Sequence, residues 1–248
     1  MYIGFGISRV RDAKGGCMQI LPNIYLADGF AYVQHPNFYV LHSEEGTVVV
    51  DAGTMGEDLE RAERQLGVWG ISLDRVDYLL LTHSHYDHIG NAATLRERGA
   101  FVVAGPGDAE GIMLADARTV PYAAGFPLPS CKVDRIVEDG DGIEACGFRF
   151  EVIHAPGHTN GSVIYRLEHA GQIIWFAGDV LFCRNTSFQP ELGWQGGEEF
   201  DKPTYIKTLK RLSSLPVDCI LAGHYMPYLR DGQRLVGRAY VKALCEWR

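Results

Sequence analysis

Short apolar runs alternate with amphipathic stretches along the chain. Runs rich in β-branched and aromatic residues predict strands at residues 38–41, 47–50, 78–81, 101–104, 148–153, 163–167, 173–177 and 219–222. Stretches with apolar residues at helical spacing predict helices at residues 57–66, 91–98, 203–212 and 233–246. This pattern is typical of the α/β class.

The order of these elements indicates how the strands pair. Residues 38–50 and 163–177 have the pattern of hairpins, and the second turns at Ala170-Gly171. A doubly wound parallel sheet would instead need strands and helices to alternate throughout. We therefore predict two mixed sheets that face each other, with helices outside them. The length favours a single domain over residues 1–248.

Composition limits the classes of partner. Hydrophobic residues make up 46% of the 248 residues and charged residues 22%, which is ordinary for a globular protein. The formal net charge is −8 and no basic run occurs, so we do not expect nucleic acid as a partner. No stretch resembles an export signal or approaches the roughly 20 apolar residues of a membrane helix. We expect a small-molecule substrate, a cytoplasmic location and no membrane partner, and a homodimer is compatible with the sequence.

Residues that can bind metals follow four of the predicted strands directly. They are His83, His85, Asp87, His88, His158, Asp179 and His224. If those strands lie side by side, their ends bring five histidines and two aspartates to one edge of the fold. A single histidine in such a place is more often a surface or packed residue. The recurrence at four strand ends favours a site.

Imidazole and carboxylate groups are ligands that zinc accepts, and a catalytic zinc keeps one position open for water. A tetrahedral ion takes four ligands, so seven candidates imply two ions. In a tight loop, His83 and His85 would face one metal, while Asp87 and His88 face the other. We expect zinc, with iron or manganese as alternatives. Structural zinc sites are usually closed and rich in cysteine, so this set favours catalysis over a metal-binding protein without activity.

Together these motifs resemble the metallo-β-lactamase superfamily. The resemblance rests on His83-x-His85-x-Asp87-His88, on Ala-Pro-Gly-His158-Thr, and on Asp179 and His224, each of which follows Ala-Gly. It covers roughly residues 20 to 226 and includes the upstream segment Val49-Val50-Asp51-Ala52-Gly53. It implies an αβ/βα four-layer sandwich of two mixed sheets flanked by helices, with the site at one edge.

The resemblance also implies a role for each residue. His83, His85 and His158 would hold the first metal, and Asp87, His88 and His224 the second. Asp179 would bridge the two ions. Asp51 would support the ligands from behind, or it would only shape the turn before Gly53. His35, His42, His154 and His169 are not expected to bind metal.

Two metals that share a water would bring its pKa towards about 7 and make hydroxide available at neutral pH. We predict that this hydroxide attacks the carbonyl carbon of a small thioester, ester or lactone while one metal polarises the oxygen. Asp87 would orient the nucleophile and pass its proton to the leaving group. The absence of a Gly-x-Ser-x-Gly segment argues against a serine hydrolase.

The bond that is cut stays open. Gly178-Asp179-Val180-Leu181-Phe182 resembles glyoxalase-II-like thioesterases, but the 24 residues after His224 are too few for their glutathione-binding helical domain. Related lactonases usually carry a tyrosine where this chain has Phe182, although Tyr86 or Tyr225 could supply a hydroxyl. The β-lactamases of the superfamily usually lack the bridging aspartate. A phosphodiesterase with the same ligands and a persulfide dioxygenase with one iron are further alternatives.

Two stretches could line a substrate pocket. Residues 184–201 form a long loop that contains Phe188 and Trp194, and loops of this length often act as lids. Simple packing of both side chains on the core is the alternative. Residues 113–129, which include Tyr122 and Phe126, are a second candidate wall. The residues expected near a substrate are Tyr86, Phe182, Trp194 and Tyr225, whereas Cys183 is expected to be a packing thiol.

Overall fold

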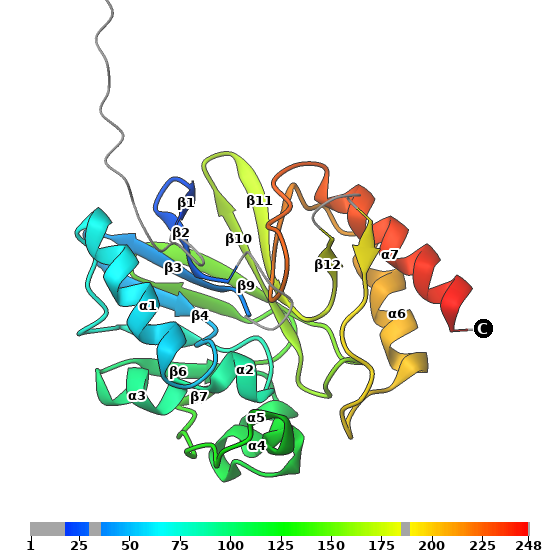
Figure 1. Ribbon diagram of the computed structural model, residues 1–248. Helices are drawn as coiled ribbons and strands as arrows, with labels where there is room; N and C mark the ends of the chain where they lie inside the picture. Colours follow the sequence, from blue (N-terminus) through cyan, green and yellow to red (C-terminus); the bar gives the residue numbers. More distant parts are fainter. Residues whose placement is uncertain (1–17, 30–35, 185–188, 248) are drawn as a thin grey trace, which may run out of the picture.

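The computed structural model describes residues 18–29, 36–184 and 189–247. Two sheets pack face to face, and helices cover the outer face of each sheet (Figure 1). The predicted α/β sandwich of two mixed sheets is therefore confirmed. That residues 1–248 make one domain stays a prediction.

The seven strands of the first sheet lie in the order of the sequence. They are β1 (Met18–Leu21), β2 (Ile24–Asp28), β3 (Phe38–Ser43), β4 (Gly46–Val50), β5 (Tyr78–Leu80), β6 (Phe101–Ala104) and β7 (Arg135–Ile136). Strands β1 to β4 pair antiparallel, and β4 to β7 pair parallel. The hairpin predicted over residues 38–50 is the pair β3 and β4.

The second sheet has the order β14-β11-β10-β9-β8. Its strands are β8 (Gly142–Ala145), β9 (Phe148–His154), β10 (Val163–His169), β11 (Gln172–Gly178) and β14 (Cys219–Ala222). Only β11 and β14 pair parallel. Ala170 and Gly171 join β10 to β11 with φ of 50° and 76°, the left-handed values that a two-residue hairpin turn requires. A small ribbon, β12 (Phe182–Cys183) with β13 (Pro190–Glu191), stands apart from both sheets.

Helices on the two outer faces complete the layers. The first sheet carries α1 (Glu57–Leu66), α3 (Ala92–Glu97) and α4 (Asp108–Leu114), and the second carries α6 (Lys202–Leu212) and α7 (Gly232–Glu246). The remaining helices are short: η1 (Gly67–Trp69), α2 (Tyr86–Ile89), η2 (Ala117–Thr119) and α5 (Pro121–Ala124). None of the helices among the described residues has the length and apolar composition needed to cross a bilayer.

Three apolar cores hold these layers together. The central core lies between the sheets and includes Tyr39, Phe150, Tyr165 and Phe176. The other two lie between each sheet and its helices. Because both faces of the inner strands are buried, these strands are continuous apolar runs and do not alternate apolar with polar residues. The elements that were not predicted are β1, β2, β7, β8, β12 and β13 and the short helices η1, α2, η2, α4 and α5. Polar residues interrupt the apolar runs of β1 and β8, whereas β2 is itself a short apolar run.

Replacing the core residue Phe176 by Ala should lower the free energy of unfolding by about 3–5 kcal/mol, because the ring is fully buried between the sheets. Denaturant titration of the metal-free protein measures the change. Val241→Ala on the exposed face of α7 is the control and should change it by less than about 0.5 kcal/mol. A loss below about 1 kcal/mol for Phe176→Ala would contradict the assigned core.

Candidate metal centre

Four loops that carry the predicted ligands leave the two sheets at one edge. They follow β5 in the first sheet and β9, β11 and β14 in the second. Backbone hydrogen bonds join the loop segments directly: Val163 N donates to Thr82 O at 2.9 Å, and Gly223 N donates to Gly178 O at 2.8 Å. The ends of the two sheets are therefore tied together at this edge, where all seven candidate residues meet.

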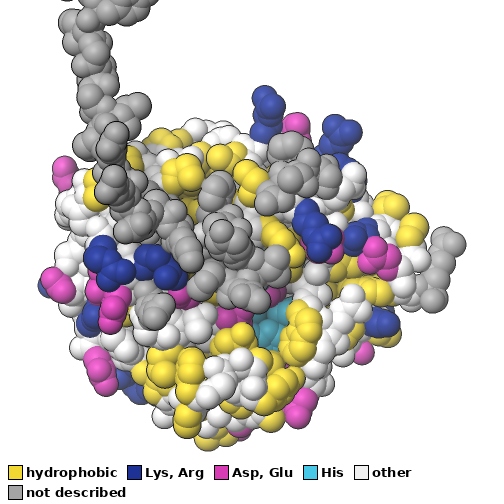
Figure 2. Space-filling model, viewed as in Figure 1, with side chains coloured by type: hydrophobic (Ala, Val, Ile, Leu, Met, Phe, Trp, Pro, Cys, Tyr) yellow, Lys and Arg dark blue, Asp and Glu magenta, His cyan; other side chains and the backbone are white. Residues whose placement is uncertain are grey.

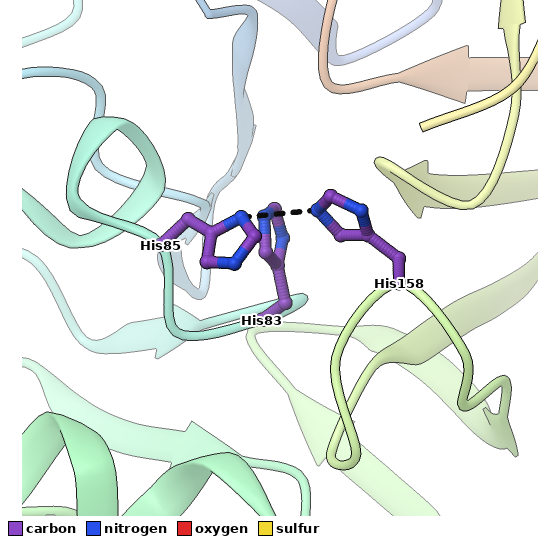
Figure 3. Close-up of side chains that lie close together, drawn as sticks. All are labelled: His83, His85 and His158. Atoms are coloured by element: carbon purple, nitrogen blue, oxygen red, sulfur yellow. Dashed lines mark hydrogen bonds between the residues drawn. The ribbon is translucent and has the colours of Figure 1, made fainter. Parts of the chain in front are cut away.

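The ligand atoms form three overlapping sets, and within each set they lie within 4.8 Å of one another. The first set is His83, His85 and His158, and we call it the three-histidine set (Figure 3). The second is Asp87, His88 and His224, here called the aspartate set. The third joins them, since it combines Asp179 with His83 and His88. All of these side chains are buried except Asp87, which is half-buried. Metal binding by them stays a prediction.

The rings of the three-histidine set face a common point. His158 Nε2 lies 3.0 Å from His85 Nδ1, and Figure 3 shows these two rings opposite each other with His83 beside them. His158 Nδ1 donates to Trp194 O at 3.1 Å, so Nε2, which lies against His85, is the unprotonated nitrogen that can bind a metal. His83 Nε2 is buried and has no hydrogen-bond partner among the described residues. A buried ring nitrogen without a partner is costly, and a bound cation would satisfy it.

The aspartate set is equally compact. His88 Nε2 lies 3.4 Å from His224 Nε2, which in turn lies 3.3 Å from Asp87 Oδ2. Asp179 reaches both sets, because its carboxylate oxygens lie 3.2 Å from His88 Nε2, 3.7 Å from His158 Nε2 and 3.5 Å from His224 Nε2. Buried imidazole and carboxylate groups arranged in this way fit two divalent ions, with Asp179 between them.

Burial and neighbouring charges give the two sets opposite protonation. Burial lowers the pKa of His83 and of His158, and it lowers the pKa of His85 to about 3. Burial would also lower the pKa of His88 and His224, but the carboxylates beside them outweigh it. The pKa of His88 therefore rises well above its usual value, and that of His224 rises to about 9.

The two carboxylates of the site respond to the same neighbours. Burial alone would raise the pKa of Asp87 and of Asp179. The positive rings of His88 and His224 more than reverse this effect and hold both pKa values below the usual range. Both carboxylates are therefore ionised at neutral pH, the form in which they bind cations.

Asp51 lies behind the ligands and also forms a strained turn. Its φ of 61° is unusual for a residue other than glycine. Its carboxylate accepts hydrogen bonds from Thr82 N at 2.8 Å and from His88 Nδ1 at 3.0 Å. The Thr82 hydroxyl also donates to Asp51, at 2.8 Å, so Thr82 Oγ1 can accept from His83 Nδ1 at 3.1 Å. One carboxylate thus fixes a ring in each set, directly for His88 and through Thr82 for His83.

Two supporting residues had no signal in the sequence. The Tyr205 hydroxyl on α6 accepts from Gly193 N at 3.0 Å and donates to the backbone oxygens of Asp179 and Val180. Asn37 donates to Ala222 O and Tyr225 O, on either side of His224, at 3.0 and 2.8 Å. Neither residue belongs to a sequence motif. Each bonds to residues that are distant from it in the sequence, so no local pattern marks it.

Gly223 allows a close approach between segments of the site. A Cβ atom there would lie 2.3 Å from Asp179 Oδ1 and 2.6 Å from His88 Cε1. Contacts this short do not occur, so only glycine lets the end of β14 bring His224 against Asp179 and His88. This explains the Gly-His order of that motif physically.

A pocket of about 380 Å³ opens over the candidate ligands. Figure 2 shows histidine side chains at the surface there, bordered by hydrophobic and acidic ones. The lining residues are His85, Tyr86, Asp87, Val120, Ala123, Asp179, Phe182, Glu191, Leu192, Trp194, His224 and Tyr225. Tyr86, Phe182, Trp194 and Tyr225 thus lie where they were expected, although contact with a substrate stays a prediction.

The two predicted walls are only partly right. From residues 184–201, Glu191, Leu192 and Trp194 line the pocket, while Phe188 lies outside the described residues. From residues 113–129, the contributing side chains are Val120 and Ala123. The stretch therefore lines the pocket as predicted, but Tyr122 and Phe126 are not among the lining residues. Tyr122 is exposed to solvent, and Phe126 packs against the outer core beside α4.

The cysteine and histidines outside the motifs have other contacts. Cys183 is buried in the core under α6 and α7, as expected for a packing thiol. Three histidines bond to nearby oxygen atoms: His42 to Thr47 Oγ1, His154 to Asn160 O and His169 to Pro22 O. Within the described residues none of these three belongs to a metal-binding group. His35 lies outside the described residues.

The family model of the metallo-beta-lactamase superfamily matches residues 31–224, and the chain belongs to this superfamily. The chain is similar to hydroxyacylglutathione hydrolase GloC of Haemophilus influenzae, with 28% identity over 73% of this chain and 81% of that protein. It is 32% identical to a hydroxyacylglutathione hydrolase of Photobacterium profundum over 72% of this chain and 56% of that protein. The matches to the corresponding Pseudomonas enzymes span about a third of their length, for example 34% of the Pseudomonas paraeruginosa protein.

Solved structures share the fold. A metallo-beta-lactamase family protein from Thermus thermophilus superposes with a TM-score of 0.73 at 24% identity, covering 92% of this chain and 81% of that one. BJP-1, a subclass B3 metallo-beta-lactamase of Bradyrhizobium japonicum, gives 0.71 at 20% identity, with 93% and 90% covered. These similarities confirm the predicted metallo-β-lactamase fold.

Metal affinity should depend on pH differently at the two sets. Because burial lowers the pKa of each histidine of the three-histidine set, these rings are neutral at pH 7, and an ion bound there displaces no proton. His88 and His224 carry protons at pH 7, and an ion at the aspartate set must displace them. Affinity for this ion should fall by about tenfold per pH unit for each proton displaced as pH drops below 9. Calorimetry in two buffers counts the protons that are released when each ion binds. Binding of both ions without proton release would contradict the protonation states assigned to the two sets.

Asp51→Asn should lower the affinity for metal by about 10- to 100-fold, because an amide cannot accept from both Thr82 and His88 as the carboxylate does. Competition with a chromophoric chelator measures the affinity. Asp74→Asn, at an exposed position in another loop, serves as the control and should bind metal like the unmodified protein. Equal affinity in the two variants would show that Asp51 only shapes its turn.

Proposed function

We propose that the chain is a dinuclear metal-dependent hydrolase that cleaves a small thioester. The observation that carries this proposal is the position of the two ligand sets, which lie side by side at the floor of a largely apolar pocket. Zinc is the ion we expect, since histidine nitrogens outnumber carboxylate oxygens among the ligands. The names of the similar proteins, hydroxyacylglutathione hydrolases, support a thioester as the bond.

The residues of the site have different roles in the proposed reaction. The three-histidine set and the aspartate set would each hold one ion. Bound there, divalent ions supply water with a pKa near 7 and polarise a carbonyl oxygen. Asp87 lines the pocket as an ionised carboxylate, so it can accept a proton from the attacking water and return it to the departing thiolate. Phe182, Leu192 and Trp194 exclude water from the acyl group.

The charge of the pocket argues against a phosphodiester. Among the described residues no lysine or arginine lines it, whereas Asp87, Asp179 and Glu191 do. With two divalent ions held by Asp87 and Asp179, a phosphodiester would find no positive charge in the lining besides those ions and would lie near Glu191, whereas a neutral thioester carbonyl needs no further cation. The number of ligands argues against a single-iron dioxygenase, because His88, His224 and Asp87 form a second complete set.

The aromatic side chains bear on the choice between thioester and lactone. The Phe182 ring packs edge-on against His224 at 5.4 Å and against Tyr225 at 5.7 Å between ring centroids. The Phe182 ring presents no hydroxyl to the leaving group, so a hydroxyl donor would have to be Tyr86 or Tyr225, which line the same pocket. A thiolate leaves with little help from a proton donor because its conjugate acid is already acidic, with a pKa near 8.5 for a simple thiol. A lactone releases an alkoxide, which needs such a donor more. This difference supports the thioester.

A substrate panel tests the proposal. Zinc-loaded protein is assayed with thioesters, oxygen esters, lactones and phosphodiesters that share acyl or aryl groups. We expect kcat/KM for thioesters to exceed the others at least tenfold, with loss on chelation and recovery on adding zinc. Hydrolysis of phosphodiesters alone, or no hydrolysis by protein that holds two ions, would overturn the proposal.

Trp194→Ala should raise KM for thioesters with long apolar acyl groups by about 5- to 10-fold and leave kcat nearly unchanged, because the ring contributes binding area and not chemistry. The backbone contact of Trp194 with His158 is kept in this variant. Trp69→Ala is a matched control, since both indole groups are about half-exposed. A fall in kcat with unchanged KM would contradict the role of Trp194 as a pocket wall.

A further inference from the structure

A buried carboxylate outside the ligand sets contacts both loops of the three-histidine set. Asp108 is the first residue of α4, and its side chain is inaccessible to solvent. Its Oδ2 accepts from Ser84 N at 2.7 Å and from Thr159 Oγ1 at 2.8 Å, and its Oδ1 accepts from Gly161 N at 2.7 Å. Three short bonds satisfy this carboxylate, which is costly to bury otherwise.

The positions of these donors show which loops the Asp108 carboxylate joins. Ser84 lies between His83 and His85, and Thr159 directly follows His158. Figure 3 shows that His83 and His85 come from one loop and His158 from another that faces it. A single side chain therefore bonds to the backbone or side chain next to every histidine of the set. The distance between the two loops depends on it.

The backbone around Asp108 packs closely against the loop that follows His158. A Cβ on Gly105 would lie 2.0 Å from Gly161 O, and one on Gly107 would lie 2.8 Å from the carbonyl carbon of Asn160. The backbone of the segment before α4 therefore lies directly against the turn after His158. Because α4 itself packs into the outer core through Ile112, Asp108 is held on a fixed element.

We propose that Asp108 is a positioning residue that sets the spacing of the three-histidine set and thereby its affinity for the first metal ion. The inference rests on the proposed dinuclear site, but not on the bond that is cut. The gap between His85 Nδ1 and His158 Nε2 is only 3.0 Å, so a small shift of one loop changes how both nitrogens meet an ion. Supporting residues of this kind commonly change metal affinity 10- to 100-fold when replaced.

Asp108→Asn tests the proposal with little change in shape. The amide nitrogen must face either Gly161 N or the donors of Ser84 and Thr159, so at least one bond is lost. We expect affinity for the first cobalt(II) or zinc equivalent to fall at least tenfold and the cobalt visible spectrum to change. Affinity for the second ion should change less than threefold. Chelator competition and absorption spectra measure both without any assay of activity.

Two further variants make the outcome decisive. Thr159→Val keeps the shape and removes one of the three bonds, together with the hydrogen bond between Thr159 Oγ1 and Ser162 Oγ at 2.6 Å. It should lower the first affinity by a smaller factor, so it decides the question if Asp108→Asn does not fold. Asp134→Asn is the control, because Asp134 also accepts from a backbone donor, Val102 N at 3.1 Å, but on β6 away from the loops. First-ion affinities equal to the control in both Asp108→Asn and Thr159→Val would overturn the proposal. If the unsubstituted protein binds two ions but cleaves no thioester, the proposed function is overturned, but the role proposed for Asp108 is not.

Discussion

Six of the seven candidate ligands are buried, and their ligand atoms face one another across a few ångströms. Ionisable groups in such a place are costly unless each is satisfied by a neighbour or by an ion. In the metal-free protein this need is met by splitting the charges, with neutral rings in the three-histidine set and protonated rings beside the two aspartates. The three-histidine set can therefore bind an ion without losing protons, whereas the aspartate set must release protons to bind one.

The rest of the fold serves to hold these groups in place. Two sheets are needed because the ligands come from strand ends in both, and the three cores fix those ends relative to one another. Side chains behind the ligands then fix the positions of the ligands. Asp51 accepts a hydrogen bond from the His88 ring, and Tyr205 and Asn37 hold the loops that carry Asp179 and His224. Loss of any of these would leave the ligands present but misplaced.

The sequence was sufficient to predict which residues meet at one edge of the fold, because each follows an apolar strand and local pattern determines where a strand ends. It also predicted the two sheets, through the hairpins at residues 38–50 and 163–177. It could not reveal Tyr205, Asn37 or Asp108, whose partners are distant in the chain and follow no local pattern. The sequence also indicated that residues 113–129 line the pocket, but not which of their side chains do so, because the turn that exposes Tyr122 and places Val120 in the lining is a tertiary feature.

Anomalous diffraction from crystals of the zinc-loaded protein measures the dinuclear site most directly. We expect two zinc peaks, one bound by His83, His85 and His158 and the other by Asp87, His88 and His224. Asp179 should contact both. A single peak at the three-histidine set in protein loaded at pH 8 with excess zinc would contradict the dinuclear site, as would two peaks of which Asp179 contacts neither.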